Sequence, residues 1–136
     1  MRTKKVKPPP KAHEYALNIS KVYDEIHKRS YISFKFRTTK EFLTFQYILK
    51  IQATVEDKKL SFAILGFSAP TSELSVSGHA GFEFRFYEFK YEEYTIFVER
   101  KDSAKMRFKL LVQKSKSEPL KVSHVPKDSF IEITYQ

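Results

Sequence analysis

The sequence predicts a mainly β (α+β) domain in which an amino-terminal helix packs on a curved antiparallel sheet of six to eight strands. The strongest observation is the run over residues 41–56, where apolar and polar side chains alternate. Side chains of a strand point alternately to its two faces, so this run indicates one face on a core and one in solvent. Such a strand is typical of antiparallel sheets, because parallel sheets are usually covered on both faces. The apolar positions are Leu43, Phe45, Tyr47, Leu49, Ile51, Ala53 and Val55.

Two further observations support this fold class. The same alternation recurs over residues 31–37, 105–113 and 130–135, so several strands share the pattern. The chain has 136 residues, the size of one domain, and a domain of that size buries roughly two thirds of the surface of its unfolded chain. The arrangement is either an open sheet or partial barrel around the helix, or a two-sheet sandwich.

Two regions are expected: a flexible, basic, proline-rich arm over residues 1–11 and a single β-rich domain over residues 12–136. Prolines at positions 8–10 stand where a secretory signal needs an apolar stretch. No apolar run approaches the roughly 20 residues of a membrane span. The chain has 0 Cys, which excludes disulfides, thiolate metal sites and cysteine nucleophiles and fits a reducing interior. We therefore expect a cytoplasmic location.

The helix is expected over about residues 14–29. Apolar residues there recur at spacings of three and four, which places them on one stripe of a helix. Lys28 and Arg29 would lie at its carboxyl end, where cations interact favourably with the helix dipole. In the alternative, residues 15–18 form a strand, and Asn18 or Ser20 caps a shorter helix. The stripe comprises Tyr15, Ala16, Ile19, Val22, Tyr23 and Ile26.

Strands and turns follow in order. Residues 31–37 form a strand with Ile32, Phe34 and Phe36 inward, and residues 38–40 turn the chain into the strand of residues 41–56. Residues 57–59 form the next turn. Residues 60–67 are apolar enough for a central strand, and residues 68–81 form the longest loop.

The second half begins with an aromatic segment. Over residues 82–89 the apolar face slips by one position between Phe86 and Tyr87, which predicts a β-bulge and two aromatic faces. The helix, or a second subunit, would cover one of them. Residues 94–100 and 105–113 form a hairpin, and residues 130–135 form the last strand. The inward positions of the hairpin's second strand are Met106, Phe108, Leu110 and Val112.

Positive charge is concentrated in two segments. The formal net charge is +9, and residues 1–11 hold five basic residues and no acidic one. Residues 100–128 hold nine basic and three acidic residues, so the remainder of the chain is slightly acidic. This asymmetry suggests an anionic partner.

The candidate binding residues are basic side chains at alternate strand positions. Lys105, Arg107 and Lys109 share one face of a strand, about 7 Å apart by strand rise, and Lys35 and Arg37 form a shorter pair. Lysine and arginine neutralise phosphates, and aromatic side chains stack on bases. The sequence therefore favours a non-enzymatic binding protein whose first-choice partner is nucleic acid or another polyanion.

No cofactor or metal is expected, because the four histidines are scattered and no catalytic motif surrounds them. Two other function classes stay open. The aromatic residues could line a β cavity that binds a small molecule. They could also form a protein-interaction or assembly surface, including a homodimer through an exposed sheet face or edge.

Overall fold

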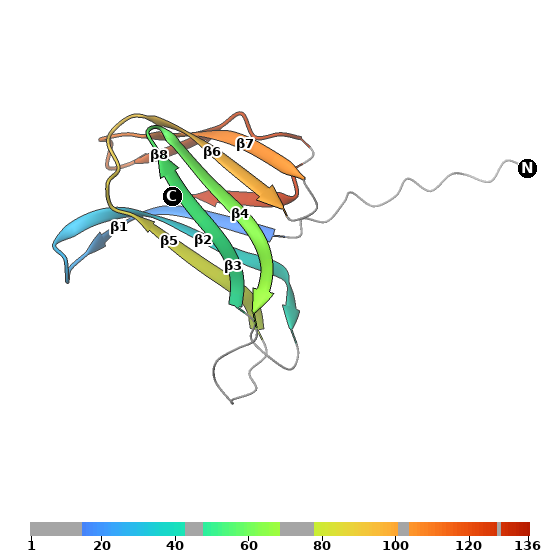
Figure 1. Cartoon of the computed structure of the whole chain (residues 1–136). Helices are drawn as coiled ribbons and strands as arrows, with labels where there is room; N and C mark the ends of the chain where they lie inside the picture. Colours follow the sequence, from blue (N-terminus) through green and yellow to red (C-terminus); the bar gives the residue numbers. More distant parts are fainter. Residues whose placement is uncertain (1–14, 43–47, 69–77, 101–103, 128) are drawn as a thin grey trace, which may run out of the picture.

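The computed structural model describes residues 15–42, 48–68, 78–100, 104–127 and 129–136, which form nine strands (Figure 1). No helix occurs within these described ranges. Hydrogen bonds join the strands in the order β8-β7-β6-β4-β3-β5-β2-β1-β9. The strands are β1 (Tyr15–Asp24), β2 (Arg29–Phe42), β3 (Ile48–Glu56), β4 (Lys59–Ser68), β5 (Gly78–Phe86), β6 (Glu93–Arg100), β7 (Lys105–Val112), β8 (Leu120–Ser123) and β9 (Ile131–Tyr135).

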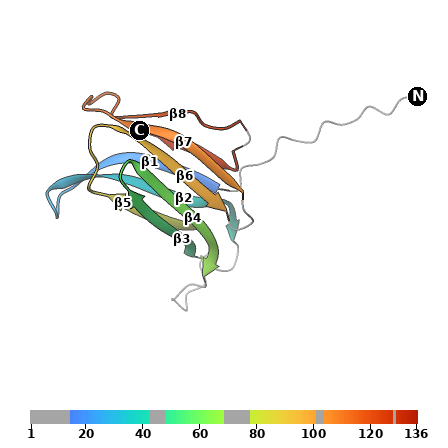
Figure 2. The same ribbon diagram turned by 45° about the horizontal axis from the view of Figure 1, so that its top comes forward.

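The sheet folds over on itself, so that its strands form two layers (Figures 1 and 2). Between β3 and β5 the backbone pairing is limited to Ile48 and Gly81. The β7 layer is β8-β7-β6-β4-β3, and the β2 layer is β5-β2-β1-β9. The ring of Phe62 on β4 lies 5.3 Å from Phe34 and 5.0 Å from Phe36 on β2, although these strands are not neighbours in the order. The two layers therefore pack face to face as a β-sandwich, one of the two predicted arrangements.

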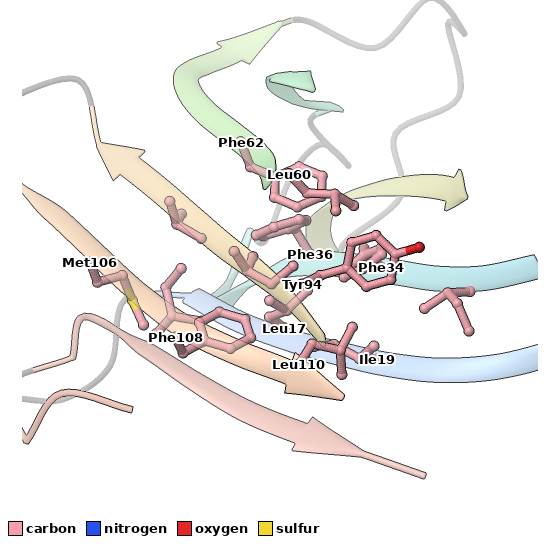
Figure 3. Close-up of a cluster of buried hydrophobic side chains, with 14 of the residues drawn as sticks. Leu17, Ile19, Phe34, Phe36, Leu60, Phe62, Tyr94, Met106, Phe108 and Leu110 are labelled. Carbon is pink, nitrogen blue, oxygen red and sulfur yellow. The ribbon is translucent and has the colours of Figure 1, made fainter. Parts of the chain in front are cut away.

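The core between the layers is aromatic and aliphatic (Figure 3). Phe34, Phe62 and Phe108 are at most 1% exposed, and burial of such a side chain stabilises the fold by roughly 2–3 kcal/mol. The predicted inward sets are confirmed, because all their members are buried. These sets are Ile32, Phe34 and Phe36 on β2, and Met106, Phe108, Leu110 and Val112 on β7.

The helix predicted over residues 14–29 is wrong for the described residues, since Tyr15–Asp24 is β1. β1 pairs with β2 in antiparallel register over its whole length, and with β9 in parallel register. Tyr15, Leu17 and Ile19 are all buried, so the buried side chains recur at every second residue, as in a strand. Leu17 is not part of the predicted helical stripe. Because residues 15–19 fit both a helical and a strand period, the pairing of β1 with β2 on one edge and β9 on the other determines that they form a strand. The other layer, not a helix, covers the aromatic sheet face.

The turn predicted at residues 38–40 is also wrong, because these residues lie inside β2, which continues to Phe42. Residues 43–47 lie outside the described residues, so the run over residues 41–56 is divided between β2 and β3. In β3 the alternation is confirmed. Leu49 is buried, whereas Val55 is 45% exposed at the far end of the strand.

The predicted bulge after Phe86 is instead the end of β5. From Phe86 the chain passes from the β2 layer to β6 in the β7 layer, and this crossover explains why the apolar pattern slips. The hairpin of β6 and β7 is confirmed. A four-residue strand, β8, lies within the polar segment before β9. The arm of residues 1–11 and most of the predicted loop, residues 69–77, lie outside the described residues.

A candidate polyanion-binding surface

The predicted basic residues are divided between the two outer faces of the sandwich. On β7, Met106 and Phe108 point into the core, so Lys105, Arg107 and Lys109 occupy outward positions. Lys35 and Arg37 occupy outward positions on β2, in the opposite layer. Because the inner faces of the layers face each other, the two basic groups point in opposite directions. The structure brings together the three residues of β7 and the two of β2, but not all five.

The outward side chains of β3, β4, β6, β7 and β8 form a surface that we call the β7 face. Arg107 lies opposite Phe97 of β6, and Phe97 lies opposite Ser61 of β4. Lys109 lies opposite Thr95, and its Nζ donates a hydrogen bond of 2.9 Å to the Thr95 hydroxyl. The β7 face thus places an arginine and an aromatic ring side by side.

Two hollows border the basic residues of this face. The larger, of about 490 Å³, lies over β3, β4 and β6 and reaches Lys105. Its floor includes the short side chains of Ser61 and Ala63, which leave space beside Phe97. The smaller, of about 400 Å³, reaches Arg107 and Lys109. The outward lining of the larger hollow is Gln52, Thr54, Lys59, Ser61, Ala63, Phe97, Glu99 and Lys105.

One of the three cations of β7 has an acidic cross-strand neighbour, since Lys105 lies opposite Glu99 of β6. None of the ion pairs among the described residues includes Lys105, Arg107 or Lys109. The Nζ of Lys59 lies 4.5 Å from the centroid of the Phe97 ring. Basic residues outnumber acidic ones at the outward positions. The basic residues are Lys50, Lys59, Lys105, Arg107, Lys109 and Lys121, and the acidic ones are Glu56, Glu93 and Glu99.

The outward side chains of β5, β2, β1 and β9 form the β2 face, on which Glu83 is paired. Among the described residues, no ion pair includes Lys35 or Arg37 of this face. Glu83, opposite Lys35, accepts hydrogen bonds from Ser33 at 2.7 Å and Arg85 at 3.0 Å. Burial raises the pKa of Glu83, but the hydrogen bonds from Ser33 and Arg85 outweigh it, so the pKa is lowered. Arg37 borders a hollow of about 610 Å³ together with Glu132.

A second paired group lies where the β1–β2 turn meets the crossover after β5. The Asp24 carboxylate accepts hydrogen bonds of 2.7 Å from the hydroxyl of Tyr87 and from Nδ1 of His27. It also accepts hydrogen bonds from the backbone N–H groups of Ile26 and His27, which fixes the turn. The hydrogen bonds from Tyr87 and then His27 hold the pKa of Asp24 well below its usual range.

Sequence reasoning missed Asp24 and Glu83. An aspartate at the end of a strand is a signal for a turn, and Asp24 could have been found on that ground. Its partner Tyr87 lies 63 positions further along the chain, so only the fold brings the two together.

Within the described part of the chain, no group of three or more His, Asp or Glu side chains is placed to hold a metal ion. The same residues include no helix of the length and apolarity needed to cross a membrane. Comparison of the chain with protein-family models, curated proteins and solved structures gave no match.

Proposed function

We propose that this chain is a non-enzymatic binding protein whose first-choice partner is nucleic acid or another polyanion, bound on the β7 face. One observation carries the proposal. Lys105, Arg107 and Lys109 occupy successive outward positions of β7, and no ion pair among the described residues engages them.

The chemistry of these side chains fits a phosphate backbone. Outward residues of one strand are about 7 Å apart, a separation that lets neighbouring cations contact successive phosphates of an extended strand. Each phosphate neutralised releases condensed counterions, so binding is favoured by entropy at low salt. Arg107 can donate two parallel hydrogen bonds to one phosphate, whereas the lysines act as point charges. Residues 1–11 add five cations without an acidic residue.

Lys35 and Arg37 have a smaller role in this proposal. They lie on the β2 face, where two acidic residues, Glu83 and Glu132, border the same hollow as this pair. On the β7 face, one acidic residue, Glu99, lies opposite the three cations of β7 in the described strands. One extended strand cannot contact the outer faces of both layers along a straight path.

The cavity alternative has less support. The rings of Phe34, Phe62 and Phe84 lie 5.3–6.3 Å apart and occupy the space between the layers. They act as core residues rather than as the lining of a hollow interior. A cytoplasmic location remains part of the proposal, on the ground that the sequence contains 0 Cys.

The test is equilibrium binding of labelled single-stranded oligonucleotides of several sequences, followed by fluorescence anisotropy over a salt series. Affinity should fall steeply with salt. Lys105→Glu or Arg107→Glu should weaken binding by a similar factor for every sequence, because phosphate contacts carry no sequence information. Glu118→Gln, a change at an exposed site off the strands of the β7 face, is the control. Absence of binding at low salt would contradict the proposal.

A further inference from the structure

Phe97 has an unusual place in the sandwich. Among the phenylalanines whose side chains the structure describes, it alone occupies an outward position of a strand. Its neighbours Ile96 and Val98 are buried in the core, whereas Phe97 is half-buried at the surface. An outward phenylalanine near the middle of a strand is not required for the core, so its surroundings indicate what it does.

Phe97 lies between cations and beside a hollow that Glu99, the next outward residue of β6, also lines. Arg107 is its cross-strand neighbour on β7, and the Nζ of Lys59 lies 4.5 Å from its ring centroid. On β4 its neighbour is Ser61, whose short side chain leaves the hollow of about 490 Å³ open at the ring. That volume lies within the range of small-ligand sites, roughly 300–1,000 Å³.

We infer that Phe97 is a stacking platform for a base of a single-stranded nucleic acid, with Arg107 and Lys105 on the adjoining phosphates. This inference rests on the proposed function. A base has a flat π face that stacks on an aromatic ring, and phosphates on either side of it meet the flanking cations. Lys59 lies over the ring by a cation–π contact, and an entering base displaces its ammonium group toward a phosphate.

The same geometry argues against the other polyanions. A duplex keeps its bases stacked inside and presents phosphates along its outside, so it cannot place a base on Phe97 without unpairing. Polyphosphate has no ring to stack. Gln52 and Thr54 line the hollow with hydrogen-bonding groups, and stacking tolerates every base. Single strands of any sequence should therefore be preferred to duplexes.

The test compares three labelled probes on the full chain: a single-stranded oligonucleotide, an abasic oligonucleotide of equal length, and inorganic polyphosphate. The ordinary oligonucleotide should bind about tenfold or more tightly than the abasic one, since stacking of this strength is typical of base–aromatic contacts. Phe97→Leu, which keeps an apolar side chain, should remove most of that difference and change abasic binding less than about twofold.

Two further variants serve as controls. Phe97→Tyr keeps the ring and should keep the preference. Leu65→Ala removes an exposed apolar side chain of β4 that lies outside the lining of the hollow, and should leave all three affinities unchanged. If Phe97→Leu does not fold, the stacking inference is still tested by two measurements. These are the affinities of the wild type and of Phe97→Tyr for ordinary and abasic oligonucleotides.

The outcomes separate the inference from the proposed function. Equal affinity of the wild type for ordinary and abasic strands, or equal weakening of both by Phe97→Leu, would overturn the stacking inference and leave polyanion binding in place. Failure of all three probes to bind at low salt would overturn both.

Discussion

The two outer faces of the sandwich carry similar residue types, but they differ in which charged side chains are hydrogen-bonded within the protein. On the β2 face, Glu83 accepts hydrogen bonds from Ser33 of β2 and from Arg85 of its own strand, and Asp24 accepts one from Tyr87 in the crossover. On the β7 face, Lys105 and Arg107 are exposed and enter no ion pair among the described residues. The comparison indicates that the carboxylates of Asp24 and Glu83 serve the fold, whereas the cations of Lys105 and Arg107 are available to a partner.

Burial explains why the two faces differ. Asp24 is only 9% exposed and Ser33 is 0% exposed, so their polar groups must find partners within the protein. Exposed lysine and arginine side chains are hydrated and need none, and surface ion pairs contribute little to stability. Substitutions on the β2 face should therefore change stability, and substitutions of the β7 cations should change binding.

The largest effect on stability is expected from Asp24→Ala. This change leaves the hydroxyl of Tyr87 and two turn N–H groups without their acceptor, and should lower Tm by roughly 5–10 °C. Thermal unfolding followed by circular dichroism measures it. Glu25→Ala, at the adjacent exposed position, should leave Tm within about 2 °C of the wild type. Equal Tm values for the two variants would contradict the role assigned to Asp24.

Acid should weaken the β2 face selectively. The pKa values of Asp24 and Glu83 are lowered in the folded state, so their contribution to stability is present above the unfolded values of about 4 and lost as pH falls below them. In urea unfolding, the stability gap between wild type and Asp24→Asn should shrink from pH 7 toward pH 2. A gap that stays constant over this range would show that ionisation of Asp24 is not what stabilises the turn.

A smaller effect is expected from Ser33→Ala. The Ser33 hydroxyl donates a hydrogen bond of 2.7 Å to Glu83 in a fully buried position, and its loss should cost about 1 kcal/mol. The matched control is Ser61→Ala on the β7 face, which should change the free energy of unfolding by less than about 0.5 kcal/mol. Urea titration of both variants measures the difference. A greater loss for Ser61→Ala would reverse the comparison between the faces.

Much of the sandwich could be predicted from the sequence because its strands have one buried face. The alternation at Phe34 and Phe36 on β2, and at Phe108 and Leu110 on β7, follows directly from contact with a core. The sequence of β1 wrongly predicts a helix because Tyr15 and Ile19 fit both the helical and the strand period, and only pairing with β2 and β9 distinguishes the two.

The candidate site was only partly predictable. The spacing of Lys105, Arg107 and Lys109 on one strand is a local property, and their shared face could be read from the sequence. Their separation from Lys35 could not, since it depends on the strand order and on the fold between β3 and β5. The neighbours of Phe97 on β4 and β7 depend on the same long-range pairing.

The central claim is that polyanions bind mainly on the β7 face, with only a small contribution from the β2 face. The most direct test compares Lys105→Gln/Arg107→Gln with Lys35→Gln/Arg37→Gln, two double variants of equal net charge. The measured quantity is the slope of log affinity against log salt for a single-stranded oligonucleotide. The β7 variant should reduce the magnitude of the slope by about 1.4, which corresponds to two lost phosphate contacts, and the β2 variant should leave it nearly unchanged. Equal reductions by the two variants, or a greater one by the β2 variant, would contradict the account.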